Sequence, residues 1–177
     1  IEDENGELYS GTVNVYATWL NPTGENLPLV MPGDMRAEDI DGEQVQLVSF
    51  GMIGVELEDA NGAPLNIAAD KTATIELPVP AELLSAAPTT IPLWHFNEAT
   101  GIWEEEGEAT LQNGVYVGTV GHFSFWNVDV PFETVTLSGS IINKGRLVPN
   151  ITAQILNEEN GTAGVAFTNE DGEFSGF

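Results

Sequence analysis

Short runs of alternating apolar and polar residues, separated by turn-forming residues, recur along the whole chain. In residues 72–77 (TATIEL) every second side chain is apolar, as expected for a half-buried strand. Residues 113–114 are Asn-Gly, a strong hairpin signal. The 19 glycines and 10 prolines punctuate these runs, and no segment reads as a convincing amphipathic helix. The chain is therefore predicted to be all-β, with residues 43–50 and 52–58 as separate strands.

The charge of the chain limits its partners. The sequence has 4 Lys and Arg against 28 Asp and Glu, a formal net charge of -24. Such a surface excludes nucleic acid as an electrostatic partner and argues against anionic lipid. Divalent cations and basic proteins suit it, although solubility in salty surroundings explains the same charge. There are no cysteines, and no apolar run is long enough to insert into a membrane.

The pattern of strands divides the chain into three segments. Residues 1–130 are expected to form one β-sandwich, 131–133 a linker, and 134–177 the N-terminal half of a second sandwich. Residues 9–19 enter a strand without a preceding partner, so an N-terminal strand is expected to be missing. If this leaves a groove, an extended segment of another module or chain is expected to fill it by strand addition.

One stretch resembles a known family. Residues 91–107 read IPLWHFNEATGIWEEEG, which resembles the PxWxFDxxTGxWxxxG hairpin of the FAM171 and cartilage intermediate layer protein group. Similar modules occur in secreted bacterial proteins. The resemblance covers about residues 9–130. It implies an extracellular β-sandwich related to ZU5 domains, and it implies no known enzyme activity.

A second resemblance covers residues 134–177. The segments 136–141 (TLSGSI), 148–153 (VPNITA) and 168–174 (TNEDGEF) resemble the start of a carboxypeptidase regulatory-like domain, a transthyretin-like sandwich. Such domains are structural and carry no peptidase site. Together the two resemblances imply a non-enzymatic structural or adhesive section of a larger secreted or cell-surface protein, from a bacterium. Fold resemblance alone does not fix the function.

The tripeptide His122-Phe123-Ser124 is the one short motif with a chemical interpretation. It is similar to the self-cleavage sites of some ZU5 domains and of a nuclear-pore protein. The resemblance implies that the Ser124 hydroxyl of this chain would attack the Phe123 carbonyl in a strained amide, with His122 as the base. The alternative is an ordinary strand from residue 122 to 128, with Phe123 packed on one face and His122 and Ser124 on the other. Self-cleavage therefore remains an alternative function.

Acidic turns are the second candidate site. Asp39, Asp41 and Glu43 alternate around a glycine and offer carboxylate oxygens to calcium. No single turn has the ligands of an EF-hand, and Asp and Gly are also the ordinary residues of turns. Calcium is the one cofactor that the sequence suggests, and a solvated turn is the alternative interpretation.

Three further patterns are weaker. Trp94, Trp103 and Trp126 would bind glycans if they lined one exposed face, although aromatic residues in strands usually belong to the core. The residues 104–106 (EEE) suggest a glycosidase pair, but neighbours on a strand point to opposite faces. His95 and His122 would make a zinc pair, but the sequence shows no convincing third ligand. Carbohydrate binding is thus a second alternative function.

Overall fold

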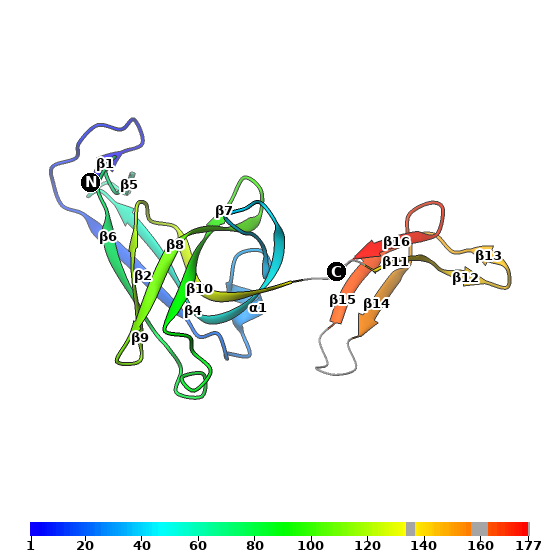
Figure 1. Cartoon of the computed structure of the whole chain (residues 1–177). Helices are drawn as coiled ribbons and strands as arrows, with labels where there is room; N and C mark the ends of the chain where they lie inside the picture. Colours follow the sequence, from blue (N-terminus) through cyan, green and yellow to red (C-terminus); the bar gives the residue numbers. More distant parts are fainter. Residues whose placement is uncertain (134–136, 157–162, 177) are drawn as a thin grey trace. The chain divides into compact units, whose positions relative to one another are not determined.

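The computed structural model describes residues 1–133, 137–156 and 163–176. The chain divides into two compact units, Ile1–Phe132 and Glu133–Phe177 (Figure 1), and each is described on its own. The segment 131–133, expected to be a linker, belongs instead to strand β10 (Phe125–Glu133). The pairing of β10 with its neighbour β7 covers only Trp126 to Val128. Pro131 lies beyond these pairs, so its missing N–H costs that ladder no hydrogen bond.

The first unit contains a ten-stranded, strongly curved sheet (Figure 1) with the order β1-β5-β4-β10-β7-β8-β9-β6. β2 pairs with β4, and β3 pairs with both β4 and β8. The pairing of β3 with β8 is parallel, and the other registers described are antiparallel. The predicted all-β class is confirmed. The strands are β1 (Glu2–Asp3), β2 (Asn14–Leu20), β3 (Arg36–Glu38), β4 (Gln44–Glu58), β5 (Pro64–Asn66), β6 (Ala73–Pro78), β7 (Thr90–Asn97), β8 (Ile102–Gln112), β9 (Val115–Val120) and β10, with one helical turn, α1 (Leu27–Val30).

One long strand replaces two predicted ones. β4 runs through Gly51 without a break, whereas the sequence predicted separate strands over residues 43–50 and 52–58. A Cβ at Gly51 would lie 3.5 Å from a methyl group of Val128 and 3.7 Å from Leu77. These are ordinary van der Waals distances, so Gly51 lies against packed neighbours within a continuous strand and does not mark a turn.

One type of turn occurs four times in the described part of the chain. A side-chain oxygen accepts hydrogen bonds from the backbone N–H groups two and four residues later, and a glycine with positive φ stands three residues later. Such turns follow from the short polar side chains of Asp and Asn. The residues whose side chains begin these turns are Asp3, Asp39, Asp59 and Asn169.

The core of the first unit consists of two clusters of buried side chains. One includes Leu77, Leu93 and Val128, and the other includes Met52 and Trp94. Leu93 and Trp94 are neighbours on β7, and both are fully buried. Since neighbours on a strand point to opposite faces, both faces of β7 are covered at this level.

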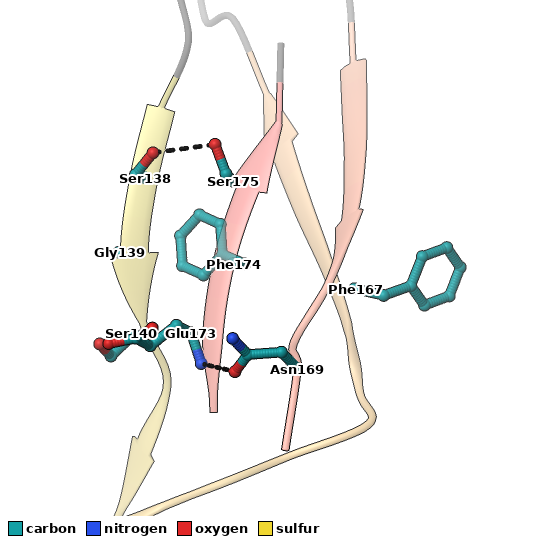
Figure 2. Close-up of a pocket in the computed structure, with 8 residues that line it drawn as sticks. All are labelled: Ser138, Gly139, Ser140, Phe167, Asn169, Glu173, Phe174 and Ser175. Atoms are coloured by element: carbon teal, nitrogen blue, oxygen red, sulfur yellow. Dashed lines mark hydrogen bonds between the residues drawn. The ribbon is translucent and has the colours of Figure 1, made fainter. Parts of the chain in front are cut away.

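The second unit contains three strand pairs: β11 with β16, β12 with β13, and β14 with β15. Figure 2 shows the residues that line a depression on β11 and β16 beside Phe167 of β15, where Phe174 lies next to Gly139. The Ser138 and Ser175 hydroxyl oxygens are 2.9 Å apart. Residues 134–136, where the second sandwich was expected to begin, lie outside the described residues. The strands are β11 (Leu137–Ser140), β12 (Ile142–Asn143), β13 (Arg146–Leu147), β14 (Thr152–Leu156), β15 (Ala163–Phe167) and β16 (Glu173–Gly176).

Candidate functional site

Two strands and one bend bring two histidines and two glutamates together. His95 on β7 stands opposite Glu104 on β8. Glu106 lies two residues further along β8 and therefore on the same face as Glu104. His122 comes from the bend at residues 121–124, between β9 and β10. We refer to His95, Glu104, Glu106 and His122 as the histidine–glutamate cluster.

The Glu106 carboxylate lies between the two imidazoles. Its Oε2 atom is 3.3 Å from Nε2 of His122 and 3.6 Å from Nε2 of His95. Oε2 of Glu104 is 3.7 Å from the same nitrogen of His95. The two imidazole rings meet edge to face, with centroids 4.9 Å apart. The side chains of His95, His122 and Glu106 are 18%, 34% and 48% exposed, so the cluster is held in the surface and remains open to solvent.

A β-bulge lies beside Glu106. The register between β7 and β8 shifts between Pro92 and Trp94, so that Glu106 and Gly107 together face Leu93. Gly107 has φ +86°, the left-handed conformation that such a bulge requires. Bulges bend a strand and redirect the side chains next to them. The bulge thus sets the direction of Glu106.

Neighbouring side chains fix the positions of the cluster. The indole N–H of Trp126 donates to the His122 carbonyl at 3.1 Å. The indole ring also packs against both imidazoles, with its centroid 4.9 Å from that of His122 and 5.7 Å from that of His95. On β8, Glu104 Oε1 accepts from Asn97 Nδ2 at 2.7 Å. These contacts restrict the cluster residues before anything binds to them.

Burial lowers the pKa of His95, and a charge on His122 would lower it further. The carboxylates of Glu106 and Glu104 act in the opposite direction, but their effects are smaller. His95 therefore favours the neutral form, in which an imidazole nitrogen has a free lone pair.

The residues of the self-cleavage motif do not lie in a strand. The sequence predicted a strand over 122–128, but β10 begins at Phe125. The reason is Asn66, whose side chain accepts from Phe123 N at 2.8 Å and donates to Phe123 O at 3.2 Å, in place of a neighbouring backbone. Ser124 Oγ donates to Phe125 O at 3.2 Å. The imidazole of His122 forms a hydrogen bond with Glu106. Within the described residues it forms none with Ser124.

The proposed calcium residues form one of the four recurrent turns. Asp39 Oδ1 accepts from the N–H groups of Asp41 and Glu43 at 3.0 and 2.8 Å. This carboxylate oxygen is therefore already used by its own backbone. Across residues 1–133, 137–156 and 163–176, the only grouping of three ligand-type side chains is His95, Glu106 and His122, with ligand atoms within 4.8 Å of one another.

The three tryptophans proposed as a glycan-binding face are fully buried. Each indole N–H donates to a backbone carbonyl: Trp94 to Asp129 O at 3.0 Å, Trp103 to Asp34 O at 2.8 Å, and Trp126 to His122. Their burial contradicts the alternative of an exposed glycan-binding face and agrees with the expectation that aromatic residues in strands belong to the core. The indole N–H groups bind the core to strand β10 at Asp129, to the loop at Asp34 and to the bend at His122.

A buried polar group on β10 was missed by the sequence analysis. Asn127 and Asp129 are fully buried, and Asn127 Nδ2 donates to Asp129 Oδ2. Ser49 Oγ in turn donates to Asn127 Oδ1 at 3.0 Å. Burial raises the pKa of the Asp129 carboxyl well above its ordinary value, against the smaller opposing effects of the neighbouring Ser49, Phe50 and Asn127. Asp129 Oδ1 has no hydrogen-bond partner among the described residues.

The chain is similar to the cartilage intermediate layer proteins. Human (Homo sapiens) cartilage intermediate layer protein 1 is 29% identical over 113 residues, which are 62% of this chain and 9% of that protein. Human cartilage intermediate layer protein 2 is 30% identical over 105 residues, 58% of this chain and 9% of that protein. The pig (Sus scrofa) protein 1 is 28% identical over 115 residues, 62% of this chain and 18% of that protein.

These matches support the relationship that the hairpin motif predicted. The chain spans less than a fifth of the length of these curated relatives. All three are mammalian, so they add nothing to the expectation of a bacterial source. No family model matches the chain, and no solved structure does. None of the helices in the described residues is long and apolar enough to cross a membrane.

Proposed function

We propose that this chain is a non-enzymatic structural or adhesive part of a larger extracellular or cell-surface protein. The observation that carries the proposal is the role of the tryptophans in the hairpin that resembles the cartilage intermediate layer proteins. Trp94 and Trp103 are buried and donate to backbone carbonyls. The two tryptophans of the motif therefore support the fold and do not form a binding surface.

The relatives support the same proposal. Their name refers to a layer of cartilage, a tissue made largely of extracellular matrix. Within the proposal, the first unit is a ZU5-related sandwich and residues 134–177 are the start of a carboxypeptidase regulatory-like domain. The recurrent turn at Asn169, between β15 and β16, is in keeping with that assignment.

An exposed edge strand is the place where another chain would attach. β2 pairs with β4 alone within the described part of the chain. Its side chains Val15, Tyr16 and Trp19 are exposed. An apolar edge of this kind pairs readily with an extended segment of a partner. We therefore assign the predicted strand addition to β2.

The test of the proposed function is the location of the full-length protein. Intact cells of the source organism are treated with a protease that cannot enter them, and the protein is followed with an antibody against this chain. We expect it in the medium or digested at the cell surface. A protein that is protected until the cells are lysed refutes an extracellular role.

One contact favours self-processing as a second candidate function. Asn66 donates to the Phe123 carbonyl oxygen, the atom on which negative charge would develop if Ser124 attacked that carbonyl. In the present arrangement Ser124 donates to Phe125 O, and His122 faces Glu106. Cleavage would therefore require both side chains to turn.

A further inference from the structure

We propose that His95, Glu106 and His122 bind one zinc-class divalent metal ion at the surface of the first unit. The site lies outside the proposed structural function and depends only on the geometry of the histidine–glutamate cluster. The sequence offered two histidines without a third ligand. The fold supplies the third from β8, where Glu106, next to the bulge at Gly107, lies between the imidazoles.

The two distances from Glu106 to the histidines match those between the ligands of a metal site. Zinc binds His nitrogen and carboxylate oxygen at about 2.0–2.2 Å in a tetrahedron, so its ligand atoms lie about 3.3–3.5 Å apart. Glu106 Oε2 lies 3.3 Å from His122 Nε2 and 3.6 Å from His95 Nε2. All three ligand atoms lie within 4.8 Å of one another. Side-chain shifts of about 1 Å are enough to bring all three ligand atoms to binding distance of one ion.

The types of ligand select the class of ion. Two imidazoles and one carboxylate suit zinc and its first-row neighbours, whereas calcium and magnesium require oxygen ligands. The fourth position is filled either by solvent, which reaches the half-exposed Glu106, or by Glu104, whose Oε2 is 3.7 Å from His95 Nε2. The net charge of -24 further attracts a cation.

The surroundings of the site hold the ligands in place. Trp126 binds the His122 carbonyl and packs against both rings. Asn66 holds the next residue, Phe123, through both its N–H and its carbonyl. Outer contacts of this kind are a regular part of protein metal sites. A bound ion would join the β7–β8 hairpin to the bend before β10 and so stabilise the first unit by mass action.

The experiment measures zinc binding by the whole 177-residue chain after removal of any polyhistidine tag. Isothermal titration calorimetry gives the stoichiometry, and thermal unfolding is followed with zinc, with calcium and with EDTA. We expect one zinc ion per chain and a higher Tm in zinc than in calcium or EDTA. Cobalt(II) provides a second readout, through the visible absorption of a tetrahedral nitrogen-and-oxygen site and quenching of Trp126 fluorescence.

Three variants separate the site from the general acidity of the surface. Glu106→Gln and His122→Ala each remove one ligand, and Glu25→Gln makes the same chemical change at an exposed turn residue as a matched control. Since loss of an outer-shell partner typically costs 10–100-fold in metal affinity, loss of a ligand is expected to weaken zinc binding at least about 100-fold. The Glu25→Gln variant should bind as the wild type does.

Two results overturn the proposal. One is an equal Tm increase in zinc and calcium that Glu106→Gln and Glu25→Gln reduce alike, because this is diffuse binding to a negative surface. The other is the absence of stoichiometric zinc binding in the wild type. Comparison of each variant with wild type in EDTA shows whether the variant folds, so a loss of binding is not confused with a loss of structure.

Discussion

Asp129 provides the sharpest test of how the first unit is held together. Its carboxyl is fully buried on β10, it accepts from Asn127 Nδ2, and its Oδ1 atom has no hydrogen-bond partner among the described residues. A buried carboxyl without a counter-charge keeps its proton, so its pKa in the folded chain is well above the value in the unfolded chain. The substitution Asp129→Asn mimics the neutral acid in shape and cannot ionise.

The sign and size of the effect follow from proton linkage. Below the unfolded pKa of about 3.9 both states are protonated, and the buried acid costs nothing in ionisation. Above it the unfolded chain loses the proton while the folded chain keeps it, so stability falls as pH rises. The slope is about 1.4 kcal/mol per pH unit until the folded pKa is reached. The stability of Asp129→Asn should lack this slope, so the variant should become increasingly more stable than the wild type as the pH rises.

The assay is urea unfolding of both proteins in EDTA at half-unit steps from pH 4.5 to 7.5, followed by tryptophan fluorescence. Trp94, Trp103 and Trp126 are buried in the first unit and report its unfolding. His95, whose pKa is lowered by burial, makes stability rise with pH below its unfolded pKa. This contribution is present in both proteins and cancels in their difference. Asp41→Asn serves as the exposed control.

The result that refutes this reasoning is a stability difference between Asp129→Asn and wild type that stays constant from pH 4.5 to 7.5. A constant deficit in the variant would mean that an ionised Asp129 has a partner in the folded chain. The same slope in both proteins would mean that another group takes up the proton on folding.

Three other substitutions test separate parts of the structure. Asn66→Ala leaves the partly buried N–H and carbonyl of Phe123 without their protein partner and should cost about 2–4 kcal/mol in urea unfolding, because each unsatisfied buried group costs about 1–3 kcal/mol and these two are only partly buried; a loss below about 0.5 kcal/mol would show that water replaces the amide. Trp103→Ala removes a fully buried ring and its bond to Asp34 O, and a loss of about 3–5 kcal/mol is expected in the same assay; a near-neutral result contradicts its place in the core. Ser124→Ala and wild type should both give one intact mass near 19.0 kDa under denaturing conditions, because Ser124 Oγ is engaged by Phe125 O; two wild-type fragments that meet at Phe123 and Ser124 would establish self-processing.

Local patterns in the sequence predict the strands better than they predict what the strands bury. The alternation of residues 72–77 appears in β6, where Ile75 and Leu77 are buried. On β10 the same rule places Asn127 and Asp129 towards solvent, yet both are as fully buried as Trp126 and Val128 on the other face of this central strand. An alternation rule describes a strand with one wet face and fails for a central strand.

The candidate metal site was half visible in the sequence. The spacing of Glu104 and Glu106 places both on one face of a strand, and residues 91–107 predict the hairpin that brings His95 beside them. Two features were out of reach. The bulge at Gly107 depends on the register of the hairpin, and the place of His122 depends on Asn66, which lies 57 residues away from Phe123 in the chain.

The hairpin that carries the similarity to other proteins serves the core and the candidate site with different residues. Trp94 and Trp103 point into the interior, whereas His95 and Glu104, their neighbours in the chain, point to the surface. A relative that keeps the tryptophans and lacks the histidines would therefore fold in the same way without the site. Similarity in this motif reports on architecture, so metal binding has to be tested on this chain itself through Glu106 and His122.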